Sequence, residues 1–129
     1  MTFMHSLSLI YSAMCLLLYL ALSVNAAMTR RKSGIVIGES NNEKLARAVR
    51  AHSNFAEYTP LFLIAFILLE SAGVSSQFLT SVGVAFLLGR VFHAYSMFAQ
   101  KGLFRVLGMM LTFIPYIIII IRLLVVYFK

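Results

Sequence analysis

The chain has 129 residues, of which 61% are hydrophobic, and its mean hydropathy is +0.92. A soluble domain of this size has no use for so much apolar surface, and the long continuous apolar runs exclude the alternating pattern of a membrane β-barrel. The net charge of +7 does not indicate nucleic-acid binding, because most cations flank apolar runs, where they set membrane topology. Composition therefore predicts an all-α integral membrane protein with a single domain over residues 1–129.

The first apolar run predicts a membrane helix over about residues 6–27. It is followed by Arg30-Arg31-Lys32, a stop-transfer pattern. A cleaved signal peptide is the competing interpretation, because Val24-Asn25-Ala26 resembles a cleavage site. We favour a retained helix, since the run is long for a signal peptide and no Lys or Arg precedes it.

The second predicted helix covers about residues 43–71, with Pro60 inside it. At about 100° per residue, its polar side chains fall within a stripe roughly 80° wide, while His52 points to nearly the opposite side. The stripe consists of Glu43, Arg47, Arg50, Asn54 and Glu57. Two cations, an amide and two carboxylates on one face are typical of a site for a polar ligand.

Two further apolar runs predict a third helix over about residues 78–98 and a fourth over about residues 103–128. Arg90 and His93 are three residues apart in the third helix, so they share a face. Two glycines on the same helix, Gly83 and Gly89, favour close packing against neighbouring helices.

Four helices with short connections predict an up-down bundle. The first and third loops carry the cations Arg30, Arg31, Lys32, Lys44, Lys101 and Arg105, whereas the second loop carries none. By the positive-inside rule, the first and third loops face the cytoplasm and both termini lie on the opposite side. This topology brings the polar part of the second helix to the level of Arg90, His93 and Arg105.

Glu57 needs a partner, because an ionisable residue in lipid costs about 2.5–3.5 kcal/mol on insertion scales. Arg50 lies about two turns away, roughly 10 Å along the axis, which is too far for a direct bond within a straight helix. We therefore expect Glu57 to pair with Arg90 of the third helix. A purely structural clamp is the alternative for this pair, but it leaves the other polar side chains at the same level without a role.

These residue types suit a small anionic, peptide-like ligand. Arginines bind carboxylates through two-pronged hydrogen bonds, Asn54 can donate and accept, and Glu57 can accept from an ammonium group. No Ser-His-Asp set is possible without an aspartate, and no residue cluster is typical of Mg²⁺, Ca²⁺ or Zn²⁺, so we expect no metal site. A nucleophile would come from a cosubstrate, and a thiol fits because an adjacent arginine favours the thiolate.

The segments RAVRAHSNFAEYTP and GRVFHAYSMF together resemble the family of membrane-associated proteins in eicosanoid and glutathione metabolism (MAPEG), and most of all its short bacterial branch. The resemblance covers most of the chain, including its length and helix order. It implies a homotrimer in a bacterial inner membrane, with glutathione bound between neighbouring subunits near the cytoplasmic side. Enzymes of the family activate glutathione as a thiolate for conjugation, peroxide reduction or isomerisation of lipophilic substrates.

The resemblance also implies roles for particular residues. It assigns glutathione binding to Arg50, Asn54, Glu57, Arg90 and His93. Arg105 lies close to where catalytic members place the arginine that stabilises the thiolate. The chain departs from the catalytic pattern at three positions, since Ser53 stands where some members have an arginine, and Met97 and Met109 where a tyrosine is expected.

Two functions follow as hypotheses. The first is a glutathione-dependent transferase or peroxidase acting on lipophilic electrophiles, with Arg105 holding the thiolate. The second is a non-catalytic membrane protein whose polar cluster serves trimer assembly or ligand sensing. A small multidrug transporter is disfavoured, because such exporters carry a carboxylate in the first helix and residues 6–27 contain none.

Overall fold

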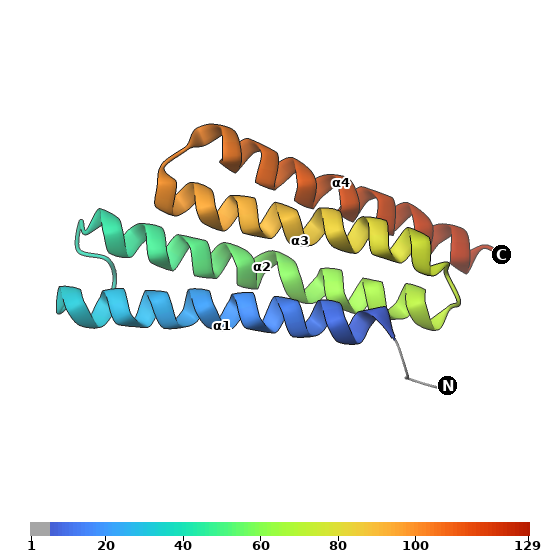
Figure 1. Ribbon diagram of the computed structural model, residues 1–129, viewed down its shortest axis with the longest axis horizontal. Helices are drawn as coiled ribbons and strands as arrows, with labels where there is room; N and C mark the ends of the chain where they lie inside the picture. Colours follow the sequence, from blue (N-terminus) through green and yellow to red (C-terminus); the bar gives the residue numbers. More distant parts are fainter. Residues whose placement is uncertain (1–5) are drawn as a thin grey trace.

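The computed structural model of the protein describes residues 6–129 as four helices joined by short connections (Figure 1). The helices are α1 (Leu7–Ser33), α2 (Glu43–Ser71), α3 (Ser76–Ala99) and α4 (Gly102–Tyr127). All four are long and apolar enough to cross a membrane, which confirms the predicted all-α four-span bundle. The α1–α2 and α3–α4 connections lie at one end of the bundle, and the C-terminus lies at the other (Figure 1).

Helix α1 is longer than the helix predicted over residues 6–27, because it continues through Arg30-Arg31-Lys32 to Ser33. The prediction ended this helix where hydrophobicity ends, but the backbone stays helical until a residue can terminate it. Gly34 does so with a left-handed φ of 69°, and its N–H donates to the carbonyl of Arg31. Cations in the last turn also suit the negative end of the helix dipole.

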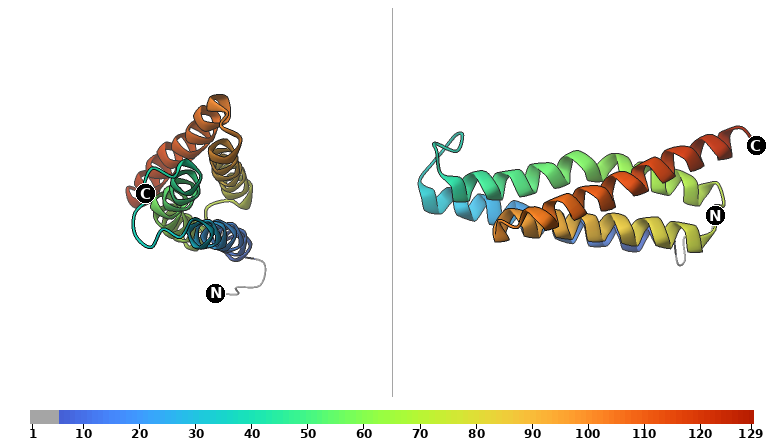
Figure 2. Two further views of the ribbon diagram at one scale, coloured as in Figure 1. Left: turned by 90° about the vertical axis from the view of Figure 1, so that its left-hand side faces the viewer. Right: turned by 90° about the horizontal axis from the view of Figure 1, so that it is seen from above.

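Helices α2 and α3 form the centre of the bundle, since each of them contacts all three other helices. Figure 2 shows α4 running obliquely across the bundle, where its main contact is with α3. The rings of Phe62 from α2 and Phe86 from α3 stack 3.7 Å apart, and the ring of Tyr116 from α4 lies 5.9 Å from that of Phe62. These aromatic contacts fix the positions of α2, α3 and α4 relative to one another.

The N-terminus of α1 is capped by a residue of α2. The carboxylate of Glu70 accepts hydrogen bonds from the backbone N–H of Leu7 at 2.6 Å and of Ser8 at 3.1 Å, and from the hydroxyl of Ser6 at 2.6 Å. A carboxylate at this position satisfies helix donors that have no intrahelical partner and complements the positive end of the dipole. Glu70 therefore fastens α1 to α2 at the end opposite the basic loops.

Helices α3 and α4 approach each other most closely at two glycines, which confirms the packing role predicted for Gly89. A Cβ added at Gly108 would lie 2.6 Å from the backbone nitrogen of His93 and 2.9 Å from the carbonyl oxygen of Gly89. Small residues at such crossings let two backbones approach within a membrane. The seam matters for the candidate site because it places the start of α4 against the end of α3.

The Gly108→Ala variant is expected to be less stable than the wild type by about 1–3 kcal/mol, because both clashing groups are backbone atoms that cannot rotate away. A Gly→Ala change in an open helix position has the opposite sign, since alanine gains about 1 kcal/mol of helix propensity. Gly102→Ala is the matched control, because a Cβ there meets nothing within 4 Å. Denaturant titrations in mixed micelles measure both variants, and equal stabilities would contradict the close α3–α4 contact.

Candidate functional site

A buried arginine joins three helices in the middle of the bundle. Arg90 of α3 is only 2% exposed. Its Nη1 donates to Oδ1 of Asn54 in α2 at 2.6 Å, and its Nε donates to Oγ1 of Thr112 in α4 at 3.1 Å. The guanidinium carbon also lies 5.1 Å from the ring centroid of Tyr58, a cation–π contact. Arg90 thus finds polar and aromatic partners on α2 and α4 without contacting lipid.

The predicted Glu57–Arg90 pair is wrong within the single chain. The only salt bridge among residues 6–129 joins Arg47 to Glu43 at 3.0 Å, and Glu57 is exposed. Asn54 takes the place expected of the carboxylate, because it lies on the side of α2 that faces α3. Glu57 follows three residues later, which places it about 60° from Asn54 around the helix axis, and it is exposed and does not face the buried guanidinium.

The remaining predicted site residues divide between the interior and the surface. His93 is 4% exposed and packs against Gly108 at the α3–α4 seam. Arg50 of α2 and Arg105 of α4 are exposed. The structure therefore brings Asn54 and Arg90 into direct contact, while Arg50, Glu57 and Arg105 face outward from the single chain.

A basic cavity of about 260 Å³ lies at the end of α3 and the beginning of α4. Its lining consists of Arg47, Ser96, Met97, Gln100, Lys101, Gly102 and Arg105. The chain turns here because α3 ends at Ala99 and is followed by Gln100, whose φ of 55° is left-handed. Three cations and no carboxylate line the cavity, so its chemistry favours an anionic ligand.

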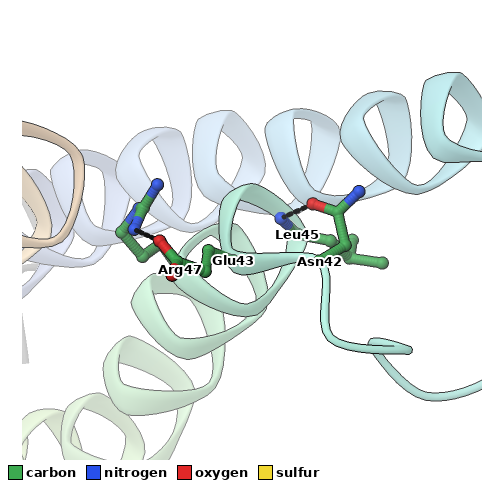
Figure 3. A network of polar contacts seen from close by, with 4 residues as sticks. All are labelled: Asn42, Glu43, Leu45 and Arg47. Atoms are coloured by element: carbon green, nitrogen blue, oxygen red, sulfur yellow. Dashed lines mark hydrogen bonds and ion pairs between the residues drawn. The ribbon is translucent and has the colours of Figure 1, made fainter.

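Arg47 reaches this cavity from α2 through a well-defined helix start. Asn42 caps α2 by accepting a hydrogen bond from the N–H of Leu45 at 3.0 Å. The next residue, Glu43, accepts from Nη1 of Arg47, which lies one turn further along the helix, at 3.0 Å (Figure 3). The sequence indicated Arg47 as part of the polar stripe. Its position beside Arg105 depends on how α2 and α4 pack together.

Two partners of Arg90, Thr112 and Tyr58, were not predicted from the sequence. Thr112 is a single polar residue inside the apolar run of α4, and this isolation is the signal that could have singled it out. Its hydroxyl accepts from Arg90 and donates to the carbonyl of Gly108 at 2.8 Å. Tyr58 lies within the conspicuous segment of α2, but an aromatic residue there does not by itself indicate a cation–π contact.

Four membrane-length helices, a buried arginine that joins α2, α3 and α4, and a basic cavity at one end define a small polytopic helical membrane protein. Residues 8–125 match the model of the MAPEG family, and the chain belongs to that family. This membership confirms the resemblance seen in the two sequence segments.

The chain is also similar to the inner membrane protein YecN of Escherichia coli, both in strain K12 and in strain O6:H1. The two chains are 26% identical over 105 residues, which cover 81% of this chain and 80% of YecN. No solved structure shows a significant match to the chain.

Proposed function

We propose that the chain is a glutathione-binding integral membrane protein that acts as a glutathione-dependent transferase or peroxidase on lipophilic electrophiles. The observation that carries this proposal is the cavity in which Arg105 lies beside Arg47 and Lys101 with no carboxylate in the lining. Nearby cations favour the charged form of a thiol, which is the nucleophilic form. Membership of the MAPEG family and the family's use of glutathione support the same ligand.

The residues around the cavity fit the chemistry of glutathione, which carries two carboxylates, one ammonium group and one thiol. Arg47 and Lys101 at the cavity, together with the exposed Arg50 one turn after Arg47 on α2, are the cations that bind the carboxylates. Gln100 and Ser96 offer hydrogen bonds at the same cavity. Arg105 is the residue that stabilises the thiolate. The thiolate sulfur then forms a bond to the electrophilic carbon of a lipophilic substrate, and the leaving group departs with its electron pair.

The homotrimer is part of this proposal, and the position of Glu57 supports it. Glu57 lies about 21 Å from the start of α2, near the middle of a helix of about 43 Å, and it is exposed in the single chain. A carboxylate facing hydrocarbon at this depth costs about 2.5–3.5 kcal/mol. A neighbouring copy that covers Glu57 and Arg50 removes this cost, and the clefts between copies admit lipophilic substrates from the bilayer.

We further propose that the protein lies in a bacterial inner membrane with the α1–α2 and α3–α4 connections in the cytoplasm and both termini on the opposite side. The positive-inside rule supports this orientation, because the cations of both connections gather at one end of the bundle. The name of YecN places that relative in the inner membrane.

A second candidate function is a non-catalytic membrane protein in which the polar cluster serves assembly or ligand sensing. The observation that favours it is the bonding of Arg90, whose donors already find Asn54 and Thr112 inside the chain. Met109 also contacts the guanidinium, with its sulfur 3.8 Å from Nη2, at a position where catalytic relatives are expected to carry a tyrosine.

The two candidates are separated by the Arg50→Gln variant. If Arg50 binds a carboxylate of glutathione, its loss is expected to weaken the binding of reduced glutathione about tenfold while the trimer persists. Equilibrium dialysis with labelled glutathione and light scattering in detergent measure the two quantities. Lys129→Gln is the control, because it removes one cation at the opposite end of the bundle. Unchanged glutathione binding with a dissociated trimer would favour the assembly role instead.

A further inference from the structure

A second basic cleft lies between α1 and α2, at the same end of the bundle as the cavity of Arg105. It consists of two overlapping cavities of about 260 and 290 Å³ that share Asn25, Thr29 and Lys44. The smaller cavity is also lined by Lys32, and the larger one by Arg47. The overlap makes one continuous polar cleft that runs from the last turns of α1 to the first turns of α2.

The cleft has unpaired positive charge and neutral donors side by side. Neither Lys32 nor Lys44 takes part in a salt bridge within residues 6–129, and no carboxylate lines either cavity. Arg47 at the edge of the cleft is held by Glu43 (Figure 3). The amide of Asn25 and the hydroxyl of Thr29 supply hydrogen bonds, and the positive end of the α2 dipole opens at the same place. This combination suits a phosphate group.

The adjoining connection indicates where such a phosphate comes from. Val36 and Ile37 are 85% and 87% exposed, and they stand side by side in the connection between α1 and α2. Nη1 of Arg30 donates to the carbonyl of Gly38 at 2.7 Å and so holds this connection beside the end of α1. Apolar side chains next to a basic cluster at a membrane-helix end are typical of a segment that enters the lipid head-group region.

We propose that the cleft between α1 and α2 binds the phosphate of an anionic phospholipid head group, with Lys32 and Lys44 as its charged ligands and Asn25 and Thr29 as its neutral donors. Val36 and Ile37 enter the same leaflet and bring the head group to the cleft. A soluble phosphate offers the same chemistry, so the test compares both sources. This lipid site adjoins the cavity of Arg105 and shares Arg47 with it, but neither Lys32 nor Lys44 lines that cavity.

The test uses the full chain, purified in detergent and depleted of lipid. Phosphatidylglycerol, phosphatidylcholine and inorganic phosphate are titrated separately, with the melting temperature and native mass spectrometry as readouts. Phosphatidylglycerol is expected to bind and to raise the melting temperature of the wild type, whereas phosphatidylcholine is expected to have little effect. The Lys32→Gln, Lys44→Gln double variant is expected to require about tenfold more phosphatidylglycerol for the same shift.

Controls separate a built site from general attraction between charges. Lys129→Gln removes a cation at the other end of the bundle and is expected to behave as the wild type. Thr29→Val keeps every charge and is expected to weaken lipid binding by a smaller factor, which also covers the case of a double variant that does not fold. A shift with inorganic phosphate that equals the lipid's would assign the phosphate to a soluble source. The proposal would be overturned if the Lys32→Gln, Lys44→Gln double variant and Thr29→Val both titrated as the wild type does. If the double variant does not fold, Thr29→Val alone decides this point. A loss of lipid binding in Lys129→Gln equal to that of the double variant would also overturn it.

Discussion

The Asn54→Leu variant is expected to lose about 3 kcal/mol or more of folding free energy, because it removes the side-chain oxygen of α2 that accepts from the buried guanidinium at 2.6 Å. Leucine fills a similar volume but offers no acceptor, so Nη1 of Arg90 keeps only a 3.5 Å contact with the backbone carbonyl at position 54. Arg90 is too deeply buried to reach water or lipid head groups. The cost therefore comes from the charge that remains rather than from the bond alone.

Unfolding in mixed micelles of denaturing and mild detergent measures this loss. Gln77→Leu is a matched control, because it also replaces an amide by leucine, at an exposed position of α3. Asn54→Asp is expected to retain most of the stability, since a carboxylate keeps the acceptor for Arg90. Equal stabilities of Asn54→Leu and Gln77→Leu would show that the arginine is not held as described.

The Arg105→Ala variant is expected to lower the rate of glutathione conjugation about 10²–10³-fold, the usual effect of removing one group that stabilises a developing or existing negative charge. Arg105 is exposed and takes part in no salt bridge among residues 6–129, so the fold and the proposed trimer are expected to persist. A model electrophile that changes absorbance on conjugation measures the rate. Arg105→Lys is expected to recover part of it, because the positive charge remains in the cavity.

Lys129→Ala serves as the control for this prediction, since it removes one positive charge without touching the cavity. A decrease in both variants would indicate a general effect of net charge. An unchanged rate in Arg105→Ala would contradict the role given to Arg105, even if glutathione still binds.

The number, order and type of the helices could be predicted because hydrophobic length and loop charge are properties of local sequence. The end of α1 could not be placed from hydrophobicity, because Gly34 terminates the helix after the apolar run has already ended. The close approach at Gly89 was predictable from its lack of a side chain. Its partner Gly108 depends on how α4 lies across α3, which local sequence does not specify.

The sequence pattern identified the polar residues of α2 but not which of them contacts Arg90. A stripe about 80° wide identifies the polar face of α2, but it does not determine which member faces the next helix. The expected partner of Arg90 was therefore Glu57, whereas the structure places Asn54 there. Charge complementarity suggested the wrong pair, because a neutral amide and the hydroxyl of Thr112 suffice to hold the guanidinium inside the bundle. Glu57 is exposed instead of buried beside the guanidinium.

A titration of the detergent-purified wild type with reduced glutathione tests the proposed function most directly. Calorimetry records the binding, and the absorbance of the thiolate is followed in parallel. Binding together with a thiolate signal is the predicted result, because cations line the cavity of Arg105. Binding without a thiolate would support ligand sensing rather than catalysis. No binding at millimolar glutathione would contradict the proposal and leave the polar cluster with a structural role alone.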